Sequence, residues 1–184
     1  MWWPESRRLT RLLLALALAG LTAGCFQPLY GTQGSAGGPG IGDKLSSVDV
    51  VPIDVPNGTR LSRIGVELRN NLLFGLTGGG GAAPTDYKLN IKLSSSQVQV
   101  IVDINTGRPD IQNYGLAASY TLVDTRTGKT VINDQTFSRV SYDIPGEQQR
   151  FAADRGLRDA ENRAAKTIAD SIRTRLASYF VAGT

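Results

Sequence analysis

The spacing of apolar residues changes twice along this chain, and these changes limit the folds open to it. Between Leu61 and Leu76, apolar residues recur every three or four positions, which places them on one face of a helix. From Asp86 onward, apolar and polar residues alternate, as in strands that bury one face. The wider spacing returns after Pro145-Gly146 and predicts a second helix over about 147–179. This order of elements indicates an α+β fold.

The first helix has clear boundaries in the sequence. Thr59 suits the N-cap position, and the helix should end at Gly78–Gly81, because four consecutive glycines cannot sustain it. Ahead of the helix, the valine-rich stretch 48–55 predicts a short strand. Pro52 and Pro56 should end that strand, since proline cannot donate to a ladder of backbone hydrogen bonds.

Three further strands are predicted before the last helix. The alternating residues of Tyr87–Leu93 and Val98–Ile104 have opposite parity. We therefore expect either a bulge in one long strand or two strands that meet near Ser94–Ser96. The other strands are expected at Leu116–Leu122 and Val131–Tyr142.

The two helices should share one face of the sheet. The second helix carries a stripe that is apolar except for Glu161 and is able to dock on a sheet: Leu157, Glu161, Ala164, Ile168, Ile172 and Leu176. We expect two helices packed on one face of a four-stranded mixed sheet, in the order β-α-β-β-β-α. The opposite face of the sheet would carry polar side chains such as Lys88, Asn90 and Lys92.

The N-terminal residues predict a lipoprotein signal peptide over 1–24. Three arginines precede a short apolar run, Leu12–Leu21, and Ala23-Gly24 then precede Cys25, the only cysteine in the chain. The run is too short to span a bilayer comfortably, because a transmembrane helix needs roughly 20 apolar residues. The arrangement resembles the lipobox of bacterial lipoproteins, so Cys25 is the expected site of lipidation. The alternative is a signal peptide followed by an unpaired thiol.

Removal of residues 1–24 changes the charge and the domain organisation. The mature chain would contain 17 basic and 15 acidic residues, and this near balance removes the main support for a nucleic-acid partner. Residues 25–44 are rich in glycine and read as a lipidated N-terminus and linker. The remainder, 45–184, should form a single α+β domain tethered to a membrane.

Catalytic chemistry has little support in the sequence. The chain contains no histidine, which removes the commonest general base and the commonest metal ligand. Asp103 and Asp110 fit a turn, and no Gly-Lys-Ser or Gly-Lys-Thr follows Gly78–Gly81, as a phosphate-binding loop would require. We therefore predict a protein that is not an enzyme, with no catalytic residues, no metal site and no cofactor.

The segment Cys25-Phe26-Gln27-Pro28-Leu29-Tyr30-Gly31 resembles the start of the mature LPS-assembly lipoproteins of the LptE family, in their alphaproteobacterial form. The similarity in element order covers most of the mature chain. The resemblance implies a lipid-anchored protein on the periplasmic side of the outer membrane. Such a protein sits in the lumen of the β-barrel LptD, assists its assembly, and with it inserts lipopolysaccharide into the outer leaflet. Phe26 fits this location, because Asp at that position favours retention in the inner membrane.

The resemblance also suggests which residues contact lipopolysaccharide. Basic residues near the tip between the second and third strands and near the start of the last helix have that role in the family, and by position these are Arg108 and Arg150. Arg126 and Lys129 are further candidates in a loop. Loop tips and helix starts are also where solvated arginines ordinarily lie. The alternative function is that of an auxiliary lipid-binding lipoprotein of an ABC-type envelope lipid-transport system.

Overall fold

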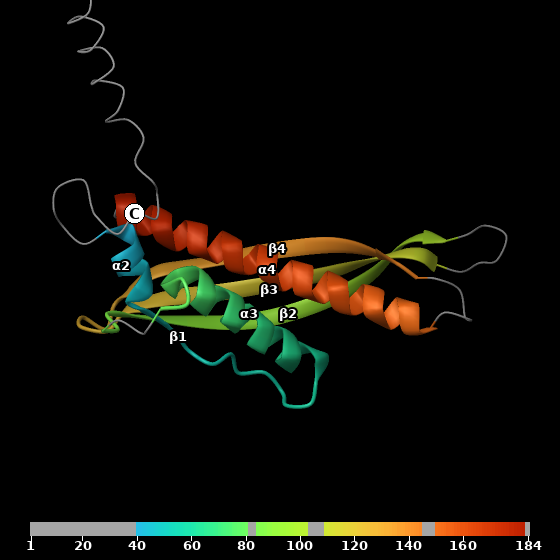
Figure 1. Cartoon of the computed structure of the whole chain (residues 1–184), viewed down its shortest axis with the longest axis horizontal. Coiled ribbons are helices and arrows are strands. Elements are labelled where there is room, and N and C mark those ends of the chain that lie inside the picture. Colours follow the sequence, from blue (N-terminus) through green and yellow to red (C-terminus); the bar gives the residue numbers. More distant parts are fainter. Residues whose placement is uncertain (1–39, 81–83, 103–108, 145–149, 183–184) are drawn as a thin grey trace, which may run out of the picture.

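Two long helices lie across one face of a four-stranded sheet (Figure 1). The computed structural model describes residues 40–80, 84–102, 109–144 and 150–182. The strands follow the order β1-β2-β3-β4, with β1 parallel to β2 and the other pairs antiparallel. The predicted fold class is therefore confirmed, mixed sheet included, and the predicted elements follow the expected order after one additional short helix.

A short helix precedes the sheet. Helix α2 (Ile41–Ser46) buries Leu45 in the core, and the carboxylate of Asp43 accepts a hydrogen bond from the Gly40 backbone N–H at 3.2 Å. We expected residues 41–44 to belong to the glycine-rich linker, and this was wrong. The six-residue helix is too short to show a periodic apolar pattern.

Strand β1 (Val48–Val50) is shorter than predicted. Its residues pair with Tyr87–Leu89 of β2 (Tyr87–Val102), and the last ladder bond runs from the Val51 N–H to the Leu89 carbonyl at 3.1 Å. Pro52 follows at once and has no N–H to donate, so the strand ends there.

Helix α3 (Arg60–Thr77) has the predicted boundaries. The Thr59 hydroxyl accepts a hydrogen bond from the Ser62 N–H at 3.2 Å, which satisfies one of the free donors of the first turn. At the other end, Gly78 adopts a left-handed conformation with φ of 63°, and its N–H bonds to the Phe74 carbonyl at 2.8 Å.

The predicted irregularity in β2 lies elsewhere than expected. Pairing with β3 (Pro109–Asp124) is continuous through Ser94–Ser96, and the register shifts fall between Gln99 and Val102. All six side chains from Ser94 to Gln99 are exposed. The apolar parity can therefore change without a bulge at the serines, because neither face of this part of the strand is buried.

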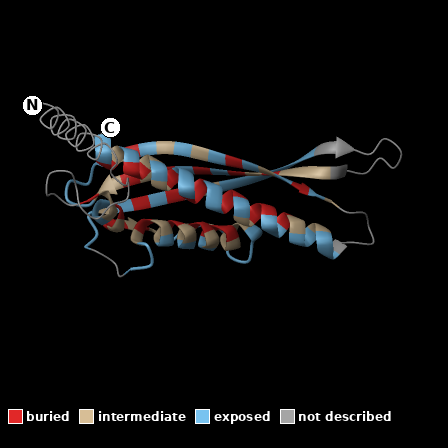
Figure 2. Ribbon diagram, turned by 45° about the horizontal axis from the view of Figure 1, so that its top comes forward, coloured by how far each residue is buried: buried red, intermediate tan, exposed pale blue. Residues whose placement is uncertain are grey.

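Helix α4 (Arg150–Ala182) packs beside α3 and over β3 and β4 (Thr130–Asp143). Its predicted stripe is buried, and Ala160, Ala164 and Ala169 allow close approach to its neighbours. Buried residues line the space between helices and sheet (Figure 2).

On the opposite face of the sheet, Lys88, Asn90 and Lys92 are exposed as predicted. None of the helices within the described ranges is both long and apolar enough to cross a membrane.

Candidate functional site

Four arginines line a hollow where the start of α3 meets the first half of α4. Arg60 and Arg63 come from α3, and Arg155 and Arg158 come from α4. We call this cavity of about 520 Å³ the arginine hollow. Its remaining walls are Gly58, Thr59, Phe151, Asp154 and Glu161.

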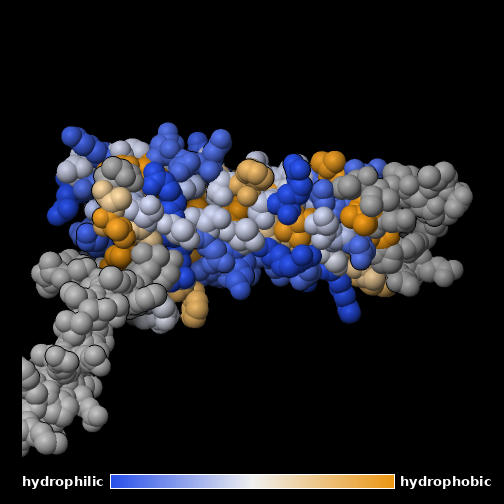
Figure 3. All heavy atoms as spheres, turned by 90° about the horizontal axis from the view of Figure 1, so that it is seen from above, coloured by the Kyte–Doolittle hydropathy of each residue, from blue (hydrophilic) through white to orange (hydrophobic). Residues whose placement is uncertain are grey.

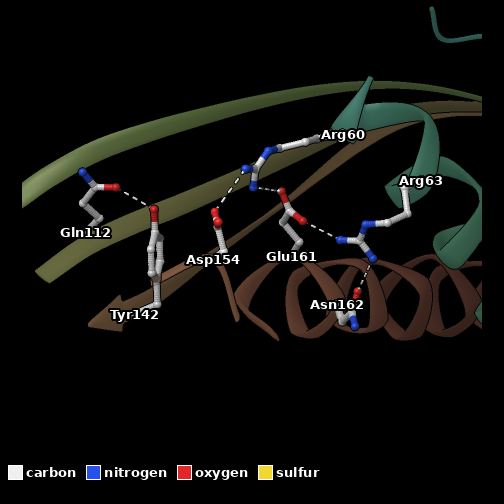
Figure 4. Close-up of polar contacts among 7 residues, drawn as sticks. All are labelled: Arg60, Arg63, Gln112, Tyr142, Asp154, Glu161 and Asn162. Carbon is white, nitrogen blue, oxygen red and sulfur yellow. Dashed lines mark hydrogen bonds and ion pairs between the residues drawn. The ribbon is translucent and has the colours of Figure 1, made fainter. Parts of the chain in front are cut away.

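A buried carboxylate fixes one side of the arginine hollow. Glu161 is 2% exposed and accepts a hydrogen bond from Nη2 of Arg63, whose Nη1 donates to Oδ1 of Asn162 at 2.7 Å (Figure 4). Nη1 of Arg60 lies 3.9 Å from Oε1 of the same carboxylate. Burying a carboxylate without a partner would be costly, so these contacts hold Arg63 in place and join the two helices.

The other charged groups of the hollow are exposed. Arg60 also reaches Asp154 at 3.4 Å, but both side chains are mostly in water, where such a pair contributes little stability. Arg155 and Arg158 are exposed and make no hydrogen bond or ion pair within the ranges that the structure describes. The hollow therefore has an excess of positive charge, with two guanidinium groups available for an external anion.

The hollow also has an apolar edge. Phe151 stands one helical turn before Arg155 and is 85% exposed. An exposed aromatic ring beside guanidinium groups that have no partner among the described residues gives the site both apolar and cationic contact area.

Nearby tyrosines border the same region. The Tyr142 hydroxyl donates to Oε1 of Gln112 at 2.6 Å, and burial raises the pKa of Tyr142 while the Arg60 charge opposes this increase (Figure 4). Burial also raises the pKa of Tyr114. These hydroxyls therefore stay protonated at neutral pH and act as neutral groups.

No cluster of His, Cys, Asp and Glu suitable for a metal ion occurs among the described residues.

A family model described as "LptE: Lipopolysaccharide-assembly" matches residues 45–176. The chain belongs to the LptE family. The predicted membership of this family is thereby confirmed, while the segment Cys25–Gly31 lies outside the matched residues.

Solved structures share the fold of this LptE family member. A lipoprotein from Caulobacter crescentus CB15 is 24% identical, with a TM-score of 0.59, 77% of this chain covered and 96% of the other. Rare lipoprotein B from Shewanella oneidensis is 14% identical, with a TM-score of 0.52 and coverage of 73% and 96%. No curated protein matches the chain.

The structure separates the residues that we expected to contact lipopolysaccharide. Arg126 and Lys129 are exposed in the turn between β3 and β4, where Oδ1 of Asp124 accepts hydrogen bonds from the N–H groups of Arg126 and Thr127 at 2.8 and 3.1 Å. These bonds, the one from Thr127 first, lower the pKa of Asp124. The turn lies at the end of the sheet where α4 finishes, whereas Arg150 begins α4 at the other end (Figure 1).

Two expected residues fall outside what the structure describes. Arg108 and Cys25 lie outside the described residues, and for Arg150 only the backbone position is described. The arginine hollow itself was missed, because its arginines read as solvated positions off the apolar stripe. One signal pointed to it: Glu161 lies on that stripe, and a carboxylate buried there needs a cationic partner.

Proposed function

We propose that this LptE family member is a lipid-anchored subunit of the lipopolysaccharide translocon in the outer membrane. In this role it sits in the lumen of the LptD β-barrel, assists assembly of the barrel and supports insertion of lipopolysaccharide into the outer leaflet. Membership of the LptE family carries the proposal. Cys25 would hold the lipid, and the protein would lie on the periplasmic side.

The uncovered face of the sheet is the surface that we assign to the barrel wall. Its cross-strand neighbours form polar rows, such as Lys92 beside Ser119 and Gln135, and none of the described helices covers them. The lumen of a large outer-membrane barrel is polar, so a protein seated in it needs a hydrophilic exterior. From above the view of Figure 1, the described surface is also largely hydrophilic, with hydrophobic residues in small groups (Figure 3).

The core fits this role better than the alternative of a lipid-binding module. A module that carries a lipid chain between sheet and helices needs an apolar groove there. In this protein the same space is filled by fully buried side chains, among them Leu68, Leu89, Leu122 and Ile168.

Copurification tests the proposal. An affinity-tagged chain, extracted from its native membranes with mild detergent, is expected to bring a large β-barrel protein with it. Recovery of the chain alone from membranes that contain such a barrel would contradict the translocon role.

A pair of variants tests the assigned surface. Ser119→Trp adds bulk to the uncovered sheet face and is expected to reduce recovery of the barrel severalfold. Ser171→Trp adds the same bulk at an exposed position on α4 and serves as the matched control. Equal recovery with both variants would show that another face meets the wall.

A further inference from the structure

We propose that the arginine hollow is a binding site for the phosphate groups of a lipid or glycolipid headgroup. The hollow lies at the junction of α3 and α4. None of the four basic residues expected to contact lipopolysaccharide (Arg108, Arg126, Lys129 and Arg150) lines it. The choice of lipopolysaccharide as one probe rests on the proposed function, but the binding chemistry of the hollow does not.

The charges in the hollow favour an anion. Four guanidinium groups face two carboxylates, and Glu161 is already occupied by Arg63. Arg155 and Arg158 are three residues apart on one helix and have no partner within the described ranges. Asp154 also lines the hollow. The four arginines and two carboxylates together leave a net positive charge, which is about equal in size to the negative charge of a phosphate monoester. A guanidinium group offers a planar pair of donors that matches phosphate oxygens.

The α3 side of the site is held in place before any ligand arrives, whereas Arg155 and Arg158 on α4 stay free to turn toward an anion. Arg63 is fixed by Glu161 and Asn162, and Arg60 reaches both Glu161 and Asp154. Fixed donors lose little conformational freedom on binding, which favours affinity. The volume of about 520 Å³ lies within the usual range of ligand sites and is suited to a headgroup.

Phe151 favours an amphiphile over a free ion. Its ring is 85% exposed and borders the same hollow as Arg155. Inorganic phosphate has no apolar part to cover such a ring, whereas a sugar ring or the glycerol of a lipid does.

Binding to defined probes tests the site. The full chain, purified in detergent, is titrated with lipopolysaccharide, with dephosphorylated lipopolysaccharide, and with vesicles that contain phosphatidic acid, each with and without inorganic pyrophosphate as competitor. The test variant is Arg155→Gln with Arg158→Gln, which leaves the ion pairs of Glu161 intact. The control variant, Lys44→Gln with Lys166→Gln, removes the same charge from exposed helix positions elsewhere.

We expect the test variant to bind at least one phosphorylated probe about tenfold more weakly or worse, and the control variant to bind as the wild type does. Pyrophosphate should compete, and dephosphorylated lipopolysaccharide should bind weakly to every variant. Loss with lipopolysaccharide alone would indicate a phosphorylated sugar, and loss with phosphatidic acid alone a phospholipid headgroup. Equal loss in test and control variants, or none in either, would overturn the proposal.

Two further measurements complete the test. Phe151→Ala should weaken binding of the lipid probes and leave pyrophosphate binding unchanged; an unchanged lipid affinity would overturn the headgroup assignment. The test variant should still copurify with the barrel. A chain that binds phosphorylated lipids but recovers no barrel would refute the translocon role and leave the arginine hollow standing.

Discussion

Arg63 of α3 donates a hydrogen bond to the buried carboxylate of Glu161 in α4, across 98 positions of sequence. The two side chains differ in exposure, at 33% for Arg63 and 3% for Glu161. Loss of either partner therefore has different consequences, because the arginine can return to water and the carboxylate cannot.

Replacement of Arg63 by alanine should destabilise the fold by about 3–5 kcal/mol, since it leaves a buried carboxylate without its main partner. Glu161→Leu should cost less, because Arg63 can turn toward solvent. Urea denaturation of both variants and of the double variant measures this asymmetry. A larger loss for Glu161→Leu than for Arg63→Ala would contradict it.

Alkaline pH should destabilise the protein through Tyr120. Burial raises the pKa of Tyr120 to about 12 from an ordinary value of 10.0. The folded state thus holds the proton more tightly, so the stabilisation is complete below pH 10 and is lost as the pH rises through 12. Two pKa units correspond to about 3 kcal/mol. Unfolding free energies measured between pH 9 and 12 should fall less steeply for Tyr120→Phe than for the wild type, and parallel curves would refute the assignment.

The end of α3 depends on the left-handed conformation of Gly78, whose φ is 63°. Gly78→Ala should lower the free energy of unfolding by about 1 kcal/mol, because a Cβ atom is disfavoured at this φ. Thermal or urea unfolding measures the change. Gly75→Ala is a useful comparison, since Gly75 has an ordinary helical φ and its added Cβ would meet only the flexible side chain of Arg173 at 3.3 Å. An equal or larger loss at Gly75 would be contrary to expectation.

Lipidation at Cys25 is expected to tether the domain to the membrane. Cells fed labelled palmitate should incorporate the label into the wild-type chain and not into Cys25→Ala, because acylation needs the thiol. The variant should also move from the membrane fraction to the soluble fraction. Labelling of Cys25→Ala would contradict the assignment of the attachment site.

The periodic parts of the sequence were sufficient to predict most of the fold. The stripes of α3 and α4 and the alternation in β2 to β4 reflect burial of one face, so they could be read without knowing the partner element. The unpredicted parts lack such a pattern. Helix α2 is six residues long, and the shift in β2 directly follows Ser94–Gln99, where both faces of the strand are exposed.

The candidate site was harder to predict than the fold. Glu161 could be placed on a buried stripe from α4 alone, but its partner Arg63 became apparent only when α3 and α4 packed together. Arg155 and Arg158 on α4 carry no local signal that separates them from solvated arginines, because the difference lies in what faces them from α3.

The first described residues and the arginine hollow lie near opposite ends of α4. Gly40 and α2 lie near the end of α4, where Phe180 also contacts Tyr87 with ring centroids 5.2 Å apart. The arginine hollow lies near the opposite end of α4, roughly 30 Å away at 1.5 Å per helical residue. Helix α4 thus separates Gly40, where the chain that follows the proposed lipid site at Cys25 enters the described domain, from the proposed contact at the hollow. On these two proposals, the anchored chain joins the domain at one end and the lipid headgroup binds at the other.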